Sequence, residues 1–171
     1  MKPLLLALLT AAAPALASTA LQMDVSSLTA QATDVVRGRV VSSTPAWTAD
    51  HRRIVTRVEV EVLETWKGNA TGRLTVLQPG GELDGIGQRV TGVAALGTGE
   101  ELVLFLERSG PHHRIVGLAQ GVYRITSAAG VRQAVPASLD GLDLVSPPGP
   151  APAARRTVPL LQLREAVQAL R

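Results

Sequence analysis

The segment RRIVTRVEVEVLETWKG, residues 52–68, decides the fold. Apolar side chains occupy every second position from Ile54 to Val62 with charged residues between them, which is typical of a strand with one buried face. At about 3.3 Å per residue, a straight strand from Ile54 to Trp66 would span roughly 40 Å, too long for one face of a small domain. After Val62 the bulky apolar residues are Leu63 and Trp66, so the alternation changes phase. This predicts a bulge that bends the strand and switches its buried face, as in a small closed barrel.

The rest of the body predicts further strands separated by glycine-containing turns. Gly38 in the middle of the first strand predicts a bulge or corner. Residues 101–107, ELVLFLE, hold five consecutive apolar residues, which indicates a central strand covered on both faces. A short helix ending by Thr33 is expected after Asp24 or Ser26, either of which can cap it. The predicted fold class is all-β, a small antiparallel barrel (OB-like), with strands at 34–43, 54–66, 73–78, 101–107, 114–119, 121–126 and 131–135.

The glycine-rich segment 79–99, PGGELDGIGQRVTGVAALGTG, separates two of these strands. A loop of this length in a compact domain is either functional or contains structure of its own, and residues 88–93 are the candidate for a short strand. The Gly85-x-Gly87 pattern does not continue as a dinucleotide-binding fingerprint, and no helical pattern follows it. We therefore assign no nucleotide site to it.

The first 17 residues have the pattern of a signal peptide. Lys2 supplies the positive charge, residues 4–13 the apolar core, and Ala15-Leu16-Ala17 a cleavage site before Ser18. The alternative is an uncleaved anchor, but the apolar run is shorter than the roughly 20 residues of a membrane-spanning helix, and no later stretch is long and apolar enough to span. We expect an exported protein, periplasmic or extracellular, with no stable membrane span after cleavage.

The C-terminal part divides into two segments of different composition. Residues 136–156 are rich in Pro and Ala, with SPPGPAPAA at their centre, and predict a linker. Residues 157–171 predict an amphipathic helix with the apolar stripe Leu160, Leu163, Val167 and Leu170. This stripe docks on the body in one reading and on a partner or membrane surface in the other. The expected organisation is a signal peptide (1–17), a β-barrel domain (18–135), a linker (136–156) and a C-terminal helix (157–171).

Charge and composition argue against a nucleic-acid partner. Residues 18–150 carry 12 Lys plus Arg against 13 Asp plus Glu, so the body is near neutral, and the excess positive charge lies in residues 151–171, with four Arg and one Glu. The 15 Arg against two Lys indicate the amino-acid usage of a GC-rich bacterial genome. One Tyr and one Phe do not supply the stacking platforms that single-stranded nucleic acids require.

The residue types and spacings of catalytic and metal centres are missing from the sequence. Without cysteine there can be no disulfide, thiolate metal site, lipid-modified cysteine or cysteine nucleophile. The histidines are His51, His112 and His113, and the last two would point to opposite faces of a strand. No metalloprotease, serine-hydrolase or calcium-loop motif occurs. We therefore assign no catalytic residue, metal ligand or cofactor.

Five segments carry a resemblance to known proteins: ATDVVRGRVVSS, VEVEVLETWKG, LQPGG, GEELVLFL and GLAQGVYRI. Over roughly residues 25–135 the chain resembles a family of short exported proteins of GC-rich bacteria, myxobacteria especially. More distantly it is similar to the OB-fold module of tissue metalloprotease inhibitors and netrin-like domains. Those inhibitors reach the protease's zinc with an N-terminal cysteine, whereas this chain has Ser18 at the expected mature terminus. The resemblance implies a fold and a compartment, and that inhibitory mechanism does not carry over.

The function expected from the sequence is that of an exported, non-enzymatic β-domain with a protein partner in the envelope or outside the cell. Trp47, in a loop, and Arg89, in the glycine-rich segment, are the candidate binding residues. Two alternatives stay open. One is an enzyme with acid/base residues Glu82, Asp84 and Arg89 in the segment 79–99, and the other is a structural accessory domain or protease-inhibitor-like module.

Overall fold

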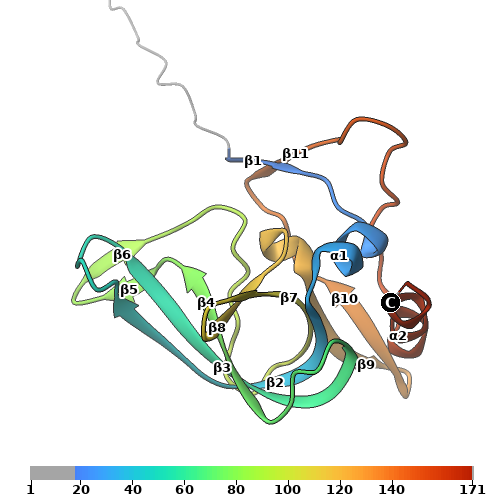
Figure 1. The fold of residues 1–171 in the computed structure, drawn as a ribbon, viewed down its shortest axis with the longest axis horizontal. Helices are drawn as coiled ribbons and strands as arrows, with labels where there is room; N and C mark the ends of the chain where they lie inside the picture. Colours follow the sequence, from blue (N-terminus) through green and yellow to red (C-terminus); the bar gives the residue numbers. More distant parts are fainter. Residues whose placement is uncertain (1–17, 171) are drawn as a thin grey trace, which may run out of the picture.

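The computed structural model describes residues 18–170 (Figure 1), so the expected signal peptide at 1–17 lies outside the described residues. The chain is mostly β, with one large sheet and two α-helices. The sheet has eight strands in the spatial order β12-β10-β9-β7-β2-β3-β4-β8. In chain order these strands are β2 (Asp34–Trp47), β3 (Ile54–Lys67), β4 (Arg73–Pro79), β7 (Glu101–Ser109), β8 (His112–Ile115), β9 (Val122–Ala128), β10 (Val131–Pro136) and β12 (Val158–Pro159).

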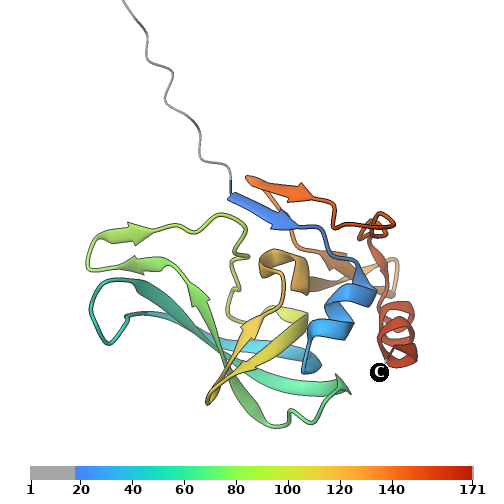
Figure 2. The same ribbon diagram turned by 45° about the horizontal axis from the view of Figure 1, so that its top comes forward.

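Two smaller sheets and three helical segments complete the fold. Strands β1 (Ser18–Leu21) and β11 (Leu142–Val145) pair in parallel, and β5 (Gly81–Leu83) and β6 (Ile86–Gln88) form an antiparallel hairpin. The helices are α1 (Val25–Gln31), the short 3-10 helix η1 (Leu118–Gly121) and α2 (Leu160–Ala169). Figure 2 shows α1 and α2 at one end of the molecule and the β5–β6 hairpin at the other. None of the helices in the described range is long and apolar enough to cross a bilayer.

The long strand β3 bends where its sequence changes phase. It pairs with β2 along its whole length, and the register shifts leave Leu63 and Trp66 without a direct partner on β2. Val58 and Val60 are buried in one core cluster, whereas Trp66 is buried in a second. The predicted bulge and change of buried face are therefore confirmed.

Gly38 allows β2 to follow this bend. A register shift lies between Arg37 and Gly38. A β-carbon at Gly38 would lie 2.5 Å from Cγ1 of Val60 and 2.9 Å from the backbone oxygen of Glu61. Any side chain here would push the two strands apart, which is the reason for glycine at the predicted bulge.

The large sheet separates two apolar cores. Its central strand β7 alternates between them, since Leu102, Leu104 and Leu106 belong to the first core and Val103 and Phe105 to the second. All five residues are fully buried, as expected for a strand covered on both faces. The first core is completed mainly by Val36, Val40, Val58, Val60, Leu74, Val76 and Val122, and the second by Leu28, Val35, Trp66, Tyr123, Leu163 and Val167.

Strand β8 has two neighbours. It pairs antiparallel with β7 over four residues, and it pairs in parallel with β4 through the single pair Val76 and His113. The sequence places this strand at 114–119, but it runs from 112 to 115. Gly117 and Leu118 have φ of 65° and 58°, a left-handed conformation that ends the strand and begins η1.

The first strand is longer than expected, because β2 continues beyond residue 43 to Trp47. Pairs with β3 extend to Trp47 and Ile54, and they include Pro45 opposite Thr56. Strand β2 pairs with β7 only from Asp34 to Arg39, so its far half lies at an edge. A proline without an amide hydrogen is tolerated in such an edge segment.

Helix α2 docks on the body rather than standing free. Leu163 and Val167 are buried in the second core, and Leu160 packs against it. Leu170, the fourth residue of the predicted stripe, is 48% exposed because the helix ends at Ala169. Three of the four stripe residues therefore face the body.

The Pro- and Ala-rich segment 136–156 lies against the body at several points. It contains β11, which pairs with β1. The amide of Ala153 donates to Oδ2 of Asp24 over 3.3 Å, and Nη1 of Arg155 donates to the carbonyl of Gln120 over 2.9 Å. Composition alone predicts a linker and misses these contacts, because each depends on a partner distant in sequence.

Candidate binding groove

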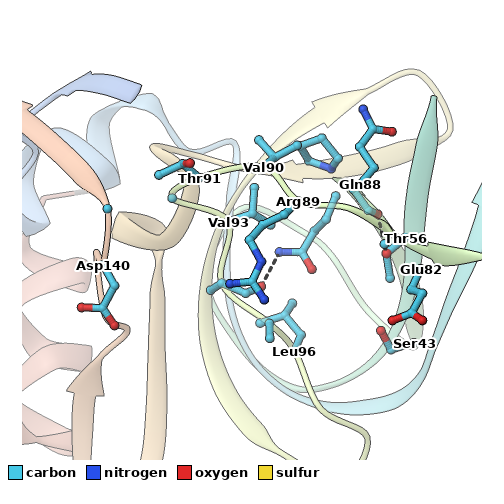
Figure 3. Close-up of a pocket in the computed structure, with 18 of the residues that line it drawn as sticks. Ser43, Thr56, Glu82, Gln88, Arg89, Val90, Thr91, Val93, Leu96 and Asp140 are labelled. Carbon is cyan, nitrogen blue, oxygen red and sulfur yellow. Dashed lines mark hydrogen bonds between the residues drawn. The ribbon is translucent and has the colours of Figure 1, made fainter. Parts of the chain in front are cut away.

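A groove of about 920 Å³ opens beside the β5–β6 hairpin (Figure 3). It lies in the glycine-rich part of the chain, which supplies most of its lining. Of the two predicted alternatives for this segment, structure of its own is confirmed, since the segment contains the β5–β6 hairpin. The lining comprises residues 79–82 and 87–96, completed by Ser43, Thr56, Gln78, Arg124, Ser138, Asp140 and Gly141.

The hairpin wall forms because Asp84 and Gly85 make a two-residue turn. Both have positive φ, 54° and 74°, as turns that match the twist of a hairpin require. A residue outside the hairpin also contacts the turn, because Nε1 of Trp47 donates to Oδ2 of Asp84 over 3.1 Å. The expected strand at 88–93 is therefore wrong. The strand is Ile86–Gln88, and the chain beyond it has no regular structure.

The hairpin is fixed to the ends of the long strands by hydrogen bonds. Oε1 of Gln88 accepts from the amide of Ile54 over 2.7 Å, and the hydroxyl of Thr56 donates to the carbonyl of Gly80 over 2.8 Å. Gly81 has φ of 144°, and a β-carbon there would lie 2.8 Å from Oγ1 of Thr56. The chain can approach β3 this closely only because residue 81 is glycine.

The opposite wall is the irregular segment 89–96. Nε2 of Gln78 donates to the carbonyl of Ala94 over 3.0 Å, and Nη2 of Arg124 donates to the carbonyl of Ala95 over 2.7 Å. These bonds use carbonyl groups only. The amides of Ala94, Ala95 and Leu96 donate no hydrogen bond to any residue between 18 and 170. The wall therefore contains three consecutive backbone amides without a hydrogen-bond partner in the described chain, and of these residues Ala95 is exposed, whereas Ala94 and Leu96 are buried in the first core.

Arg89 supplies an uncompensated positive charge. Its side chain is exposed and extends into the groove (Figure 3), and it forms no ion pair or hydrogen bond with the described part of the chain. Arg124 differs, since its Nε lies 3.4 Å from Oε1 of Glu100. Glu82 and Asp140 lie on opposite sides of Arg89 in Figure 3. The groove thus has two arginines, of which Arg89 has no ion-pair partner in the described chain, and two carboxylates, which lie on opposite sides of Arg89 in this view.

The groove brings together only some of the residues of the enzyme alternative. Of the three residues of the enzyme alternative, Glu82 and Arg89 line it, whereas Asp84 is at the hairpin turn, bonded to Trp47. No histidine lines the groove. Within residues 18–170 no three His, Cys, Asp or Glu side chains are arranged to hold a metal ion. The charged residues that line the groove are Arg89, Arg124, Glu82 and Asp140, beside backbone groups and apolar side chains.

A second charged cluster surrounds Asp34, away from the groove, and it is structural. The Asp34 side chain is only 1% exposed. It accepts hydrogen bonds from the amides of Asn69 and Ala70 at 3.0 and 3.1 Å, from the Thr33 hydroxyl at 3.1 Å and from Nε of Arg108 at 3.1 Å. The carboxylate thereby fixes the turn between β3 and β4.

The pKa values in this cluster follow from its burial. Burial alone would raise the pKa of Asp34, but the hydrogen bonds from Arg108, Asn69 and Thr33 outweigh it and hold the pKa below its usual range. His113 lies with Nε2 3.8 Å from Oδ2 of Asp34. Burial lowers the pKa of His113 and outweighs the attraction of the nearby Asp34 carboxylate. A neutral imidazole beside a charged carboxylate is therefore the stable arrangement.

Comparison of the chain with protein-family models, with curated proteins and with solved structures finds no match. The groove is therefore interpreted from its own geometry.

The two predicted binding residues have different places in this geometry. Arg89 lines the groove, whereas Trp47 does not. The expected loop position of Trp47 is wrong, because it is the last residue of β2, where its indole donates to Asp84 at the hairpin turn. Sequence reasoning missed Gln78, Arg124 and Asp140, which come from β4, β9 and the loop before β11. The one sequence pattern that indicates part of this groove is the Asp84-Gly85 pair between apolar residues, because such a pair is typical of a hairpin turn.

Proposed function

We propose that this protein is an exported, non-enzymatic β-domain that binds a partner protein through the groove, in the envelope or outside the cell. The observation that carries the proposal is the wall at 94–96, where three backbone amides have no hydrogen-bond partner among residues 18–170, beside Arg89, which has no ion pair with the same residues. Surfaces that leave main-chain groups unpaired are typical templates for another chain. The export part of the proposal rests on the signal-peptide pattern at 1–17.

The body is an OB-like barrel in this proposal. The pairings β7–β2, β2–β3, β3–β4, β4–β8 and β8–β7 support it, because they run through five strands and return to the first. The parallel pair between β4 and β8 and the bend in β3 also fit such a barrel. The groove is then lined mainly by the segment that joins the barrel strands β4 and β7.

The experiment is affinity capture with a variant in which the groove is filled. Gly87 lines the groove, has an ordinary φ, and a β-carbon built on it meets no atom within 4 Å. It pairs directly with Glu82, so a new side chain would point to the same face as Glu82. Gly87→Leu should therefore fill the groove without disturbing the hairpin.

The matched control is Gly97→Leu. Gly97 is exposed, does not line the groove, and a β-carbon there would make only ordinary contact with Glu100. The mature wild-type protein and both variants are used to capture proteins from the periplasm and culture medium of the native host. A stoichiometric partner held by the wild type and by Gly97→Leu but lost from Gly87→Leu supports the proposal. If Gly87→Leu captures the same partner as wild type, the binding surface lies elsewhere. If no partner is captured at all, the enzyme or structural alternative is favoured.

A further inference from the structure

We infer that the groove takes an extended peptide segment of the partner, with a single carboxylate that binds Arg89 and a backbone that pairs with the wall at 94–96. The inference rests on the proposed function and names the chemistry of its ligand. It depends on three features of the groove: its unpaired backbone donors, its isolated cation and its flanking carboxylates.

The unpaired amides favour a polypeptide. A peptide in an extended conformation offers carbonyl acceptors at regular spacing, and because successive amides of an extended segment point to opposite sides, it would accept from alternate amides of the wall. The wall is already fixed through its carbonyls by Gln78 and Arg124, so its position does not depend on the ligand. The half-buried Val90 and Val93 line the same groove and offer contacts to apolar side chains of the peptide.

Arg89 selects a carboxylate. An arginine guanidinium matches a carboxylate in a bidentate geometry, and a charge-assisted bond is stronger than a neutral one. Arg89 has no carboxylate partner in the described chain, whereas Arg108 and Arg124 each have one and Arg37 has two. This makes Arg89 available to a ligand.

Glu82 and Asp140 limit how much negative charge the groove accepts. They lie on either side of Arg89. A run of acidic residues would bring further carboxylates close to both, and like charges repel. One acidic residue, or a free C-terminal carboxylate, is favoured over an acidic stretch.

The test uses a library of random 12-residue peptides displayed on phage and selected on the wild-type protein, and the enriched peptides are then measured on Gly87→Leu. Enriched peptides are then synthesised with their carboxylate intact and replaced by the amide, and their dissociation constants are measured. We expect one acidic position in the enriched set. Arg89→Ala should weaken binding of the acidic peptide by about 10- to 100-fold and leave that of the amide peptide unchanged. Arg73→Ala is the matched control, since Arg73 is exposed and does not line the groove.

Several outcomes would overturn the inference. The selection could enrich no peptide, or only peptides without an acidic residue. The acidic peptide could bind Arg89→Ala as tightly as wild type, or inorganic phosphate could bind in an Arg89-dependent way while no peptide binds. The proposed function fails separately. If natural-partner capture is lost in Gly87→Leu but the peptides do not depend on Arg89, the groove binds a protein by other chemistry and only the inference fails. Peptides that bind Gly87→Leu as well as wild type contradict both.

Discussion

Replacing Val60 by Asp tests the phase of the strand on which the whole fold depends. Val60 is fully buried in the first core, opposite Val40 on β2 and Leu74 on β4. The substitution loses about 1.5 to 3 kcal/mol of apolar burial and places an unpaired polar or charged group in an apolar site. We expect a loss of unfolding free energy on the order of 3 kcal/mol or more. For a domain of this size that lowers the Tm by at least about 6 °C.

The adjacent substitution Glu59→Lys is the control. Glu59 is half-exposed and accepts one hydrogen bond, from the Thr75 hydroxyl at 2.8 Å. A lysine can extend its amine into water, so the expected loss is under about 1 kcal/mol. Urea and thermal unfolding followed by circular dichroism measure both variants, and Val60→Ala should fall between them. Equal stabilities of the Asp and Lys variants would show that the assignment of faces is wrong.

Three further predictions concern other parts of the chain. The pKa of Asp34 is lower in the folded protein than in the unfolded chain, so its ionised carboxylate stabilises the fold fully above an unfolded pKa of about 3.9. This stabilisation is lost as the pH falls through the lower folded value. Urea titrations at decreasing pH should show that the unfolding free energy falls less steeply for Asp34→Asn than for wild type, and equal slopes would contradict this. Leu163→Ala should cost about 2 kcal/mol or more, because Leu163 is 2% exposed, whereas Leu161→Ala, at a residue that is 61% exposed, should cost under about 0.5 kcal/mol; equal melting temperatures would mean that α2 does not dock. Intact-mass analysis of the exported protein should give a chain that begins at Ser18, and a mature chain that retains Lys2 would refute the cleavage prediction.

The elements that could be predicted from the sequence are those with a local pattern. The phase change at Leu63 and Trp66 marked the bulges of β3, and the apolar run in β7 marked the central strand. Asp24 caps α1 as expected, since its Oδ1 accepts from the amide of Ser27 over 2.8 Å. In each case the physical cause lies within a few residues, so periodicity or composition carries it.

The groove could not be predicted in this way, because residues distant in sequence form it. Arg89 was a candidate only as a charge in an unusual segment, while Asp140 joins the groove from the loop before β11, far from Arg89 in the sequence. The Asp84-Gly85 turn carried a local signal, but five glycines between 80 and 92 obscured which pair makes the turn. The pairing of β11 with β1 left no local signal in a segment whose composition predicts a linker.

Amide hydrogen exchange tests the central claim, that the groove is the binding surface, most directly. In the free protein the amides of Ala94, Ala95 and Leu96 have no hydrogen-bond partner within the described chain, so they should exchange rapidly. In complex with the captured partner, or with a selected peptide, exchange at these three amides should slow markedly, while Gly97→Leu behaves as wild type. Unchanged exchange at 94–96 with protection elsewhere, for example along α2, would contradict the claim and place the partner on another face.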